Sequence, residues 1–126
     1  MAFEDDSTNT IARDETSDLI SSAKVEGTAV FDRDGNRLGS IDSFMVGKLD
    51  GRVRYAVLSF GGLFGMGERY HPLPWDTLTY DTDKGGYVVN ISKERLEGGP
   101  SYQRGEEPTF NRQYGETISD YYLSAH

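Results

Sequence analysis

Short apolar runs alternate with glycine and Asp-Gly turns from Lys24 onwards, and this pattern predicts a small all-β domain. The expected strands span residues 25–31, 38–46, 53–60, 69–75, 78–80 and 86–91. Residues 53–60 are mainly apolar on both faces, which is typical of a strand that is covered on both sides. The Asp50-Gly51 pair before it predicts a two-residue hairpin turn, because both residues tolerate positive φ. Six short strands in this space predict a small, mostly antiparallel six-stranded barrel.

The fourth expected strand carries two prolines, Pro72 and Pro74, at alternate positions. Their missing N–H groups lie along the same edge, so this strand is expected at a sheet edge or at the seam of a barrel. Trp75, the only tryptophan, shares the face of Leu73 and is expected to be mostly buried. His71 shares that face too, and a hydrogen-bonded, partly buried structural histidine is the interpretation that we favour.

The two ends of the chain differ from the middle. Residues 1–23 carry six acids and one base, with Leu19 and Ile20 as their only apolar pair of note, which predicts a disordered acidic tail. The barrel domain is expected at residues 24–98, with one or two helical turns at 92–97. Residues 99–126 form an extension in which an apolar stripe predicts a helix, weakened by Gly115 by about 1 kcal/mol relative to alanine. The stripe consists of Phe110, Tyr114, Ile118, Tyr121 and Tyr122.

Composition narrows the possible functions. The net charge of −8 comes mainly from the ends, because residues 24–98 carry eleven acids against ten bases. An acidic chain is poorly suited to grip a phosphate backbone, so no direct nucleic-acid partner is expected. The absence of cysteine excludes disulfides, thiolate catalysis and cysteine-based zinc sites. With neither a signal peptide nor an apolar run of about 18 residues, we expect a cytoplasmic protein without a membrane span.

Two glycine-containing segments could suggest ligand sites. Asp32, Asp34 and Asn36 match positions one, three and five of a calcium loop, but Arg37 and Ser43 occupy positions six and twelve, so a hairpin turn is favoured. Residues 61–67 are glycine-rich but lack the Gly-Lys-Ser/Thr ending of a phosphate loop. Three apolar side chains of that segment are expected to pack on the barrel or on a partner, namely Leu63, Phe64 and Met66.

The sequence contains no recognisable set of catalytic or metal-binding residues. His71 and His126 are the only histidines, and no clustered carboxylates complete a metal site around either. A G-x-S-x-G elbow is absent, and the carboxylate pair Asp81 and Asp83 falls in an expected turn. We therefore expect no catalytic residue, no metal and no cofactor.

The strand pattern resembles that of PRC-barrel domains over about residues 24–96. The stretches that carry the resemblance are GTAVFD at 27–32, DG at 34–35, LGSI at 38–41, YAVLSFGG at 55–62, GMGERYHPLPW at 65–75, LTYD at 78–81 and GYVV at 86–89. The family is known as a small β-barrel in the cytoplasmic part of the photosynthetic reaction-centre H subunit, in a ribosome small-subunit maturation factor and in stand-alone bacterial and archaeal proteins. The resemblance implies a protein-docking barrel with no shared catalytic residues.

This chain departs from both named relatives. It has an acidic tail where the H subunit has a membrane helix, and it leaves no room for the extra RNA-associated domain of the maturation factor. The resemblance therefore implies the stand-alone bacterial type.

Three functions stay open at this level. The favoured one is a non-catalytic docking or self-association module, expected as a homodimer or as the receiver of another protein. The alternatives are an accessory of photosynthetic or ribosome-maturation machinery, and a small enzyme. The expected partner-binding residues are Leu63, Phe64, Met66, Phe110, Tyr114, Ile118, Tyr121 and Tyr122. The helical stripe can pack either on its own barrel or on a second subunit.

Overall fold

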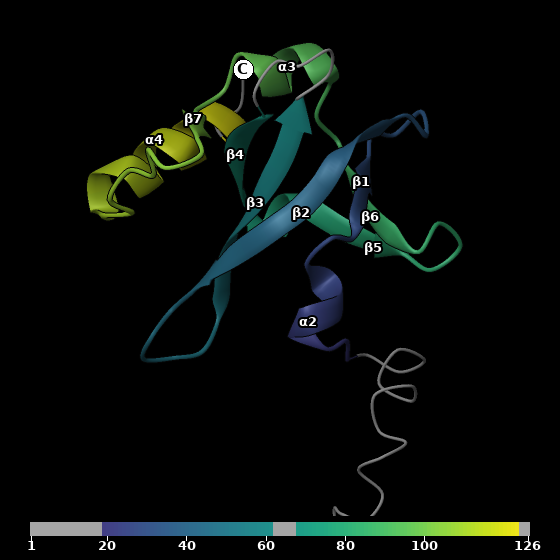
Figure 1. The fold of residues 1–126 in the computed structure, drawn as a ribbon, viewed down its shortest axis with the longest axis horizontal. Coiled ribbons are helices and arrows are strands. Elements are labelled where there is room, and N and C mark those ends of the chain that lie inside the picture. Colours follow the sequence, from purple (N-terminus) through teal and green to yellow (C-terminus); the bar gives the residue numbers. More distant parts are fainter. Residues whose placement is uncertain (1–18, 62–67, 124–126) are drawn as a thin grey trace, which may run out of the picture.

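A computed structural model describes residues 19–61 and 68–123, which form a bent sheet flanked by short helices (Figure 1). The seven strands are β1 (Ala29–Phe31), β2 (Arg37–Val46), β3 (Val53–Gly61), β4 (Glu68–Pro74), β5 (Leu78–Asp81), β6 (Gly86–Val89) and β7 (Tyr102–Gln103). Their order in the sheet is β5-β6-β1-β2-β3-β4-β7. All neighbouring pairs are antiparallel except β1 and β6, which run parallel. The predicted all-β fold is confirmed, and the short β7 adds a seventh strand to the six expected.

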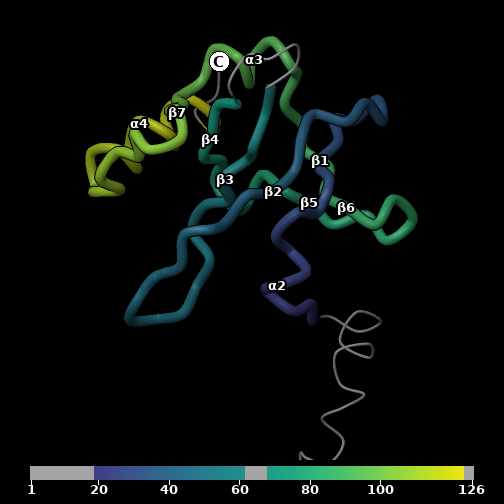
Figure 2. The backbone as a smooth tube through the Cα atoms, viewed as in Figure 1, coloured from purple at the N-terminus to yellow at the C-terminus, as the bar shows by residue number. Residues whose placement is uncertain are grey.

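The long strand β2 lies at the centre of the sheet, with β4 and β5 on opposite sides of it (Figure 2). Its pairing with β3 shifts register between Ile41 and Ser43 and again between Met45 and Val46. Such irregularities bend a strand and increase its twist, so they allow β2 to serve both halves of the sheet. The 3-10 turn η2 (Trp75–Thr77) links β4 to β5. Within the described residues the two edges of the sheet do not pair, so the barrel is not closed by backbone hydrogen bonds.

Three helices pack around this sheet: α2 (Ser22–Val25), α3 (Lys93–Glu97) and α4 (Arg112–Leu123). The Ser21 side chain caps α2 by accepting from Ala23 N at 3.3 Å. The strand expected from residue 25 therefore starts only at Ala29, because the chain first completes this helical turn. The helical turns expected at 92–97 are confirmed as α3, which the Ser92 hydroxyl caps by accepting from Arg95 N at 3.0 Å.

A single core holds sheet and helices together. Ile20 of the expected tail packs against this core, as does Trp75. Trp75 is only half-buried, so the prediction of a mostly buried tryptophan was too strong. The side chain lies against Phe44 and Tyr87, with ring centroids 6.3 Å and 5.7 Å away. The fully buried large aliphatic side chains are Val30, Ile41, Val57, Leu58, Leu73, Val89, Leu96 and Ile118.

Strand β4 is an edge strand over most of its length, as its prolines predicted. All of β4 pairs with β3, whereas β7 pairs only with Arg69 and Tyr70. Beyond Tyr70, the outer edge that contains Pro72 and Pro74 has no strand partner among the described residues. Helix α4 contacts β4 instead. Proline thus blunts the part of this edge, beyond Tyr70, that no described strand covers.

The β2–β3 hairpin ends in a loop of six residues, not the two-residue turn expected from Asp50-Gly51. Val46 pairs with Val53, which leaves Gly47–Arg52 as the loop. Gly47 N donates to Arg52 O at 2.8 Å, and Gly51 adopts a φ of 73° that favours glycine. We call residues 47–52 the hairpin tip; it projects away from the rest of the sheet (Figure 2).

Candidate functional site

The inner face of α4 packs on the chain's own sheet. Ile118 has no exposed surface, and Tyr122 is buried beside it in the core. Two of the residues expected at a partner contact are therefore covered within one chain. The α4 helix itself confirms the period of the stripe, although Phe110 lies just before its first turn.

Tyr121 joins α4 to α3. Its hydroxyl donates to Arg95 O at 2.7 Å, the Arg95 guanidinium donates to Tyr121 O, and the guanidinium carbon lies 5.1 Å from the Tyr121 ring centroid. A Cβ on Gly99 would come within 2.3 Å of the Tyr122 hydroxyl and 3.0 Å of the Tyr121 ring. The Gly98-Gly99 step therefore does more than end α3, since its bare backbone makes room for these two rings.

Phe110 and Tyr114 belong to an aromatic cluster that ties the start of α4 to the sheet. The ring centroid of Phe110 lies 6.1 Å from Tyr55, 6.4 Å from Tyr102 and 5.1 Å from Tyr114. Tyr102 stacks in turn on Tyr70 at 5.8 Å. Burial raises the pKa of Tyr102 to about 12, so this phenol stays neutral at physiological pH. Both expected partner residues are half-buried here.

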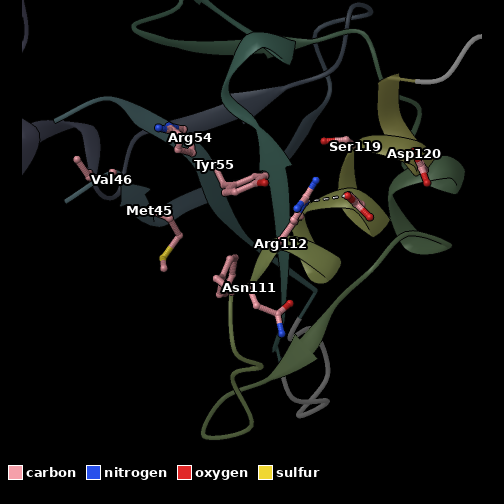
Figure 3. A pocket seen from close by; sticks show the side chains of 12 residues that line it. Met45, Val46, Arg54, Tyr55, Asn111, Arg112, Ser119 and Asp120 are labelled. Atoms are coloured by element: carbon pink, nitrogen blue, oxygen red, sulfur yellow. Dashed lines mark ion pairs between the residues drawn. The ribbon is translucent and has the colours of Figure 1, made fainter. Parts of the chain in front are cut away.

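A groove of about 520 Å³ separates the β2–β3 hairpin from the outer side of α4. One wall carries Met45 and Val46 from β2, and the floor is formed by Tyr55 and Phe110. Figure 3 shows Met45, Val46 and Tyr55 on one side of the hollow, and Ser119 and Asp120 of the helix on the other. We call this hollow the α4 groove. It combines an apolar floor with a polar rim, as docking sites on proteins do.

Exposed apolar side chains gather around the hairpin and α4. Of the large apolar residues that the structure describes, six are exposed, and four of them lie here. Met45 is 36 % exposed, Val46 46 % and Leu49, at the hairpin tip, 102 %. Leu123, at the end of α4, is 53 % exposed and borders a smaller hollow on the other side of Arg54. Neighbouring exposed apolar groups of this kind mark interaction surfaces.

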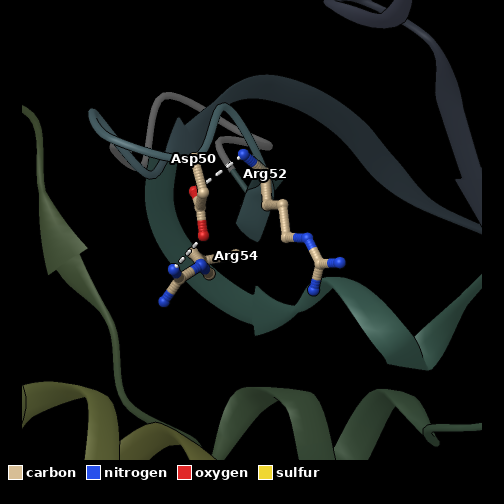
Figure 4. A network of polar contacts seen from close by, with 3 residues as sticks. All are labelled: Asp50, Arg52 and Arg54. Atoms are coloured by element: carbon tan, nitrogen blue, oxygen red, sulfur yellow. Dashed lines mark hydrogen bonds and ion pairs between the residues drawn. The ribbon is translucent and has the colours of Figure 1, made fainter.

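The hairpin tip is held in shape by one carboxylate. Asp50 accepts from Arg52 N at 3.0 Å through one oxygen and pairs with the Arg54 guanidinium at 2.7 Å through the other (Figure 4). The bond from the Arg52 backbone, together with the Arg54 side chain, lowers the pKa of Asp50. A Cβ on Gly47 would lie 2.3 Å from the same carboxylate. The tip therefore has a defined shape that presents Lys48 and Leu49 outward.

Charge differs between the two walls of the groove. The end of the hairpin, residues 45–54, carries Lys48, Arg52 and Arg54 against the single acid Asp50. The exposed side of α4 carries Glu116 and Asp120, and Glu116 forms an ion pair with Arg112 at 3.4 Å. In the part of the chain that the structure describes, the side chains of Lys48, Arg52 and Asp120 have no ion-pair partner. The hairpin is thus a basic projection on an otherwise acidic chain.

The turns considered as ligand loops are filled by their own backbones. Asp32 Oδ1 accepts from Asp34 N and from Asn36 N, each at 2.9 Å, which is the expected hairpin turn. Asp81 caps its turn in the same way, accepting from Asp83 N at 2.9 Å. Residues 19–61 and 68–123 contain no group of three or more His, Asp or Glu side chains that could hold a metal ion.

His71 is more deeply buried than the sequence indicated. It is 2 % exposed, its ring lies 5.4 Å from Phe60 in an edge-to-face arrangement, and its Nδ1 has no hydrogen-bond partner. Burial, with a smaller contribution from Arg69, lowers the pKa of His71 to about 4, against a weaker opposing effect of a hydrogen bond to the Leu96 backbone. This neutral imidazole is a core residue on β4 and faces none of the hollows described here.

Most of the glycine-rich segment lies outside the residues that the structure describes. Leu63, Phe64 and Met66 fall within residues 62–67, so the structure does not place these three expected partner residues. A broad depression of about 1030 Å³ borders this segment at Gly61 and is lined by mixed charges such as Arg37 and Glu97. No buried polar group without a hydrogen bond lines this depression, so nothing in its lining points to a ligand.

Sequence reasoning missed the hairpin side of this surface. Met45 and Val46 lie at the end of the strand expected at 38–46, and the pattern predicted no partner contact for Leu49. A signal was nevertheless present, because two consecutive apolar residues at a strand end, followed by leucine in a polar turn, leave apolar surface without a place in the core.

A match to a protein-family model agrees with the fold. Residues 17–96 match the family model of the PRC-barrel domain. No curated protein matches the chain. Among solved structures, a RimM protein of Pseudomonas aeruginosa, described as a 16S ribosomal RNA processing protein, is 19 % identical, with a TM-score of 0.42. The similarity covers 59 % of this chain and 44 % of that one, so this chain spans less than half of that protein.

In the described residues no helix is long and apolar enough to cross a membrane, and the longest, α4, has twelve residues. The family match extends over most of the chain and includes α2, the strands β1 to β6 and all but the last residue of α3. The chain belongs to the PRC-barrel domain family.

Proposed function

We propose that this PRC-barrel protein is a non-catalytic docking module that associates with a second copy of itself through the β2–β3 hairpin and the outer side of α4. The observation that carries the proposal is the grouping of Met45, Val46, Leu49 and Leu123, all exposed, around these two elements. Burial of such side chains stabilises association by roughly 25 cal/mol for each Å² of apolar surface removed from water.

The packing of α4 supports this choice of surface. Because Ile118 and Tyr122 are buried in the chain's own core, only the other side of the helix is available to a partner. Phe110, which lies just before α4, belongs to two surfaces, since it packs in the aromatic cluster and also lines the α4 groove. A partner on this face would therefore meet a helix that the core already holds in place.

The oligomeric state tests the proposal directly. Sedimentation equilibrium of the full chain, from low micromolar to near-millimolar concentration, should give a mass approaching twice 14.1 kDa. A mass of 14.1 kDa at every concentration would contradict self-association.

A pair of variants tests whether the dimer forms through the hairpin and the outer side of α4. Leu49→Ser should weaken the dimer, because the leucine is fully exposed in one chain and is expected to be buried in the contact. Tyr80→Ser is the matched control, since Tyr80 is also exposed and apolar but lies on β5. The control should keep the wild-type dissociation constant.

A further inference from the structure

We propose that the two copies exchange contacts reciprocally: the hairpin tip of each chain lies in the α4 groove of the other. The inference rests on the proposed self-association and specifies its geometry. It follows from three properties of the surface, namely the shape of the tip, the composition of the groove and the distribution of charge.

The tip is suited to insertion because its shape exists before binding. Asp50 joins Arg52 N and the Arg54 guanidinium, and Gly47 N donates to Arg52 O across the loop. A loop already held in one conformation loses less entropy on association than a flexible one. Its outermost apolar side chain, Leu49, is fully exposed and makes no ring contact or hydrogen bond within the described chain.

The groove is suited to receive such a side chain. Tyr55 and Phe110 form a half-buried apolar floor, and Met45 with Val46 extends it along the hairpin. Its volume of about 520 Å³ is enough for a leucine and parts of the flanking side chains. No residue of the described chain fills the hollow.

Charge selects the second copy as the occupant. Lys48 and Arg52 lie on the tip near Leu49, and neither has an ion-pair partner among the described residues. Four charged side chains line the groove: Arg54, Arg112, Glu116 and Asp120. Arg54 is paired with Asp50 and Arg112 with Glu116, so Asp120 is the lining charge left without an ion pair in the described residues. The whole chain carries −8, so two copies repel each other in most orientations. Placing the basic tip against Asp120 of α4 brings opposite charges together.

Because each chain both inserts its tip and receives one, the assembly ends at two copies. Each chain carries both the tip and the groove, so a twofold axis forms the same contact twice and leaves neither free. A single one-way contact would leave a tip and a groove exposed and would continue into a chain of subunits. The geometry thus corresponds to a dimer and not to a filament.

A charge-swap experiment tests the pairing. The hairpin variant is Lys48→Glu with Arg52→Glu, and the helix variant is Glu116→Lys with Asp120→Lys. Each variant alone should raise the dimer dissociation constant at least tenfold, because like charges then face each other in both contacts. In an equimolar mixture both contacts again join opposite charges, so native mass spectrometry should show the heterodimer in preference to either homodimer.

The matched control is Arg33→Glu with Arg37→Glu, which changes the net charge of the chain as much as the hairpin variant does. Both arginines are exposed, and Arg37 lies at the opposite end of β2 from the hairpin tip. The dissociation constant of this control should stay within about twofold of wild type. Circular dichroism and the melting temperature should show that all variants remain folded.

The outcomes separate the two proposals. A wild-type monomer would overturn self-association, and the reciprocal contact with it. A wild-type dimer would overturn only the reciprocal contact in any of three cases: both variants keep the wild-type affinity, the control is weakened as much as they are, or the mixture does not restore the dimer.

Discussion

The hydroxyl of Tyr55 on β3 lies directly against Gly115 in α4, so that a Cβ on Gly115 would come within 2.5 Å of this oxygen. A glycine inside a helix costs about 1 kcal/mol relative to alanine, and for that reason the sequence predicted a weakened helix. The contact explains why the helix nevertheless contains it. The bare backbone lets α4 approach the aromatic cluster, and the gain in packing offsets the lost helix propensity.

Gly115→Ala should therefore destabilise the protein by about 1–2 kcal/mol, although alanine is the better helix former. In a Tyr55→Phe background the same substitution should be neutral or stabilising, because the nearest remaining ring carbon lies 3.7 Å from the new methyl group. Urea unfolding of the four proteins in this double-mutant cycle measures both effects. Equal losses in the two backgrounds would show that the clash is with something other than the hydroxyl.

The Tyr55–Gly115 contact also marks the limit of what the sequence predicts. The strands and the proline-blunted edge of β4 could be predicted, because the alternation of apolar residues and the missing N–H of proline are properties of a short stretch of sequence. That α4 packs on its own sheet through Ile118 depends on contacts between distant segments. The stripe alone favoured packing on its own barrel but was also compatible with a second subunit.

The hairpin tip is a second feature that the sequence pattern did not predict. Asp50-Gly51 has the residue types of a two-residue turn, but the Asp50 carboxylate bonds to Arg52 N and to Arg54, and a six-residue loop results. Side-chain bonds of this kind compete with the regular turn and are not encoded in the residue pair. The α4 groove was missed for a different reason, because its walls come from residues 45–55 and 110–120, which only the fold brings together.

The buried His71 predicts sensitivity to mild acid. Its pKa is about 4 in the folded chain and 6.5 in the unfolded chain, so between these values the unfolded state binds the proton and the folded state does not. Stability is thus lost as the pH falls from 6.5 to 4, by about 3 kcal/mol from this group. Above pH 6.5 the imidazole is neutral in both states and contributes no pH dependence.

Comparison of the wild type with His71→Leu separates the effect of the histidine on stability from that of the carboxylates, because the carboxylates titrate equally in both proteins. Urea unfolding at pH 7 and at pH 5 should show that the wild type loses more stability on acidification than the variant. The leucine also removes the unpartnered Nδ1 from the core, so the variant should not be much less stable at pH 7. Parallel pH profiles for the two proteins would contradict the assignment of a neutral, buried histidine.

Ile118 should behave as a core residue of a single chain. Because it has no exposed surface, Ile118→Ala should cost about 2–4 kcal/mol through lost burial and the cavity that remains. Thr117→Ala, at the exposed neighbouring position, is the control and should cost far less. The loss should be the same at every protein concentration. If it grew on dilution, Ile118 would lie in a contact between subunits.

Asp32 should stabilise its turn without binding calcium. Its carboxylate accepts from Asp34 N, Asn36 N and the Asn36 side chain, and the bond from the Asn36 backbone is the main reason why the Asp32 pKa lies below its usual value. A lowered carboxyl pKa means that this stabilisation is present above the pKa of the unfolded chain and is lost as the pH falls through the folded value. Asp32→Ala should therefore lower the melting temperature at pH 7 and have a smaller effect at pH 3. Asp32→Asn, which keeps the acceptor oxygen, should retain more of the wild-type stability than alanine does.

Calcium titrated against the wild type should give no saturable shift in melting temperature, because the turn uses the carboxylate oxygens that a calcium ion would need. A saturable shift that Asp32→Ala abolishes would show that the loop opens to bind the ion.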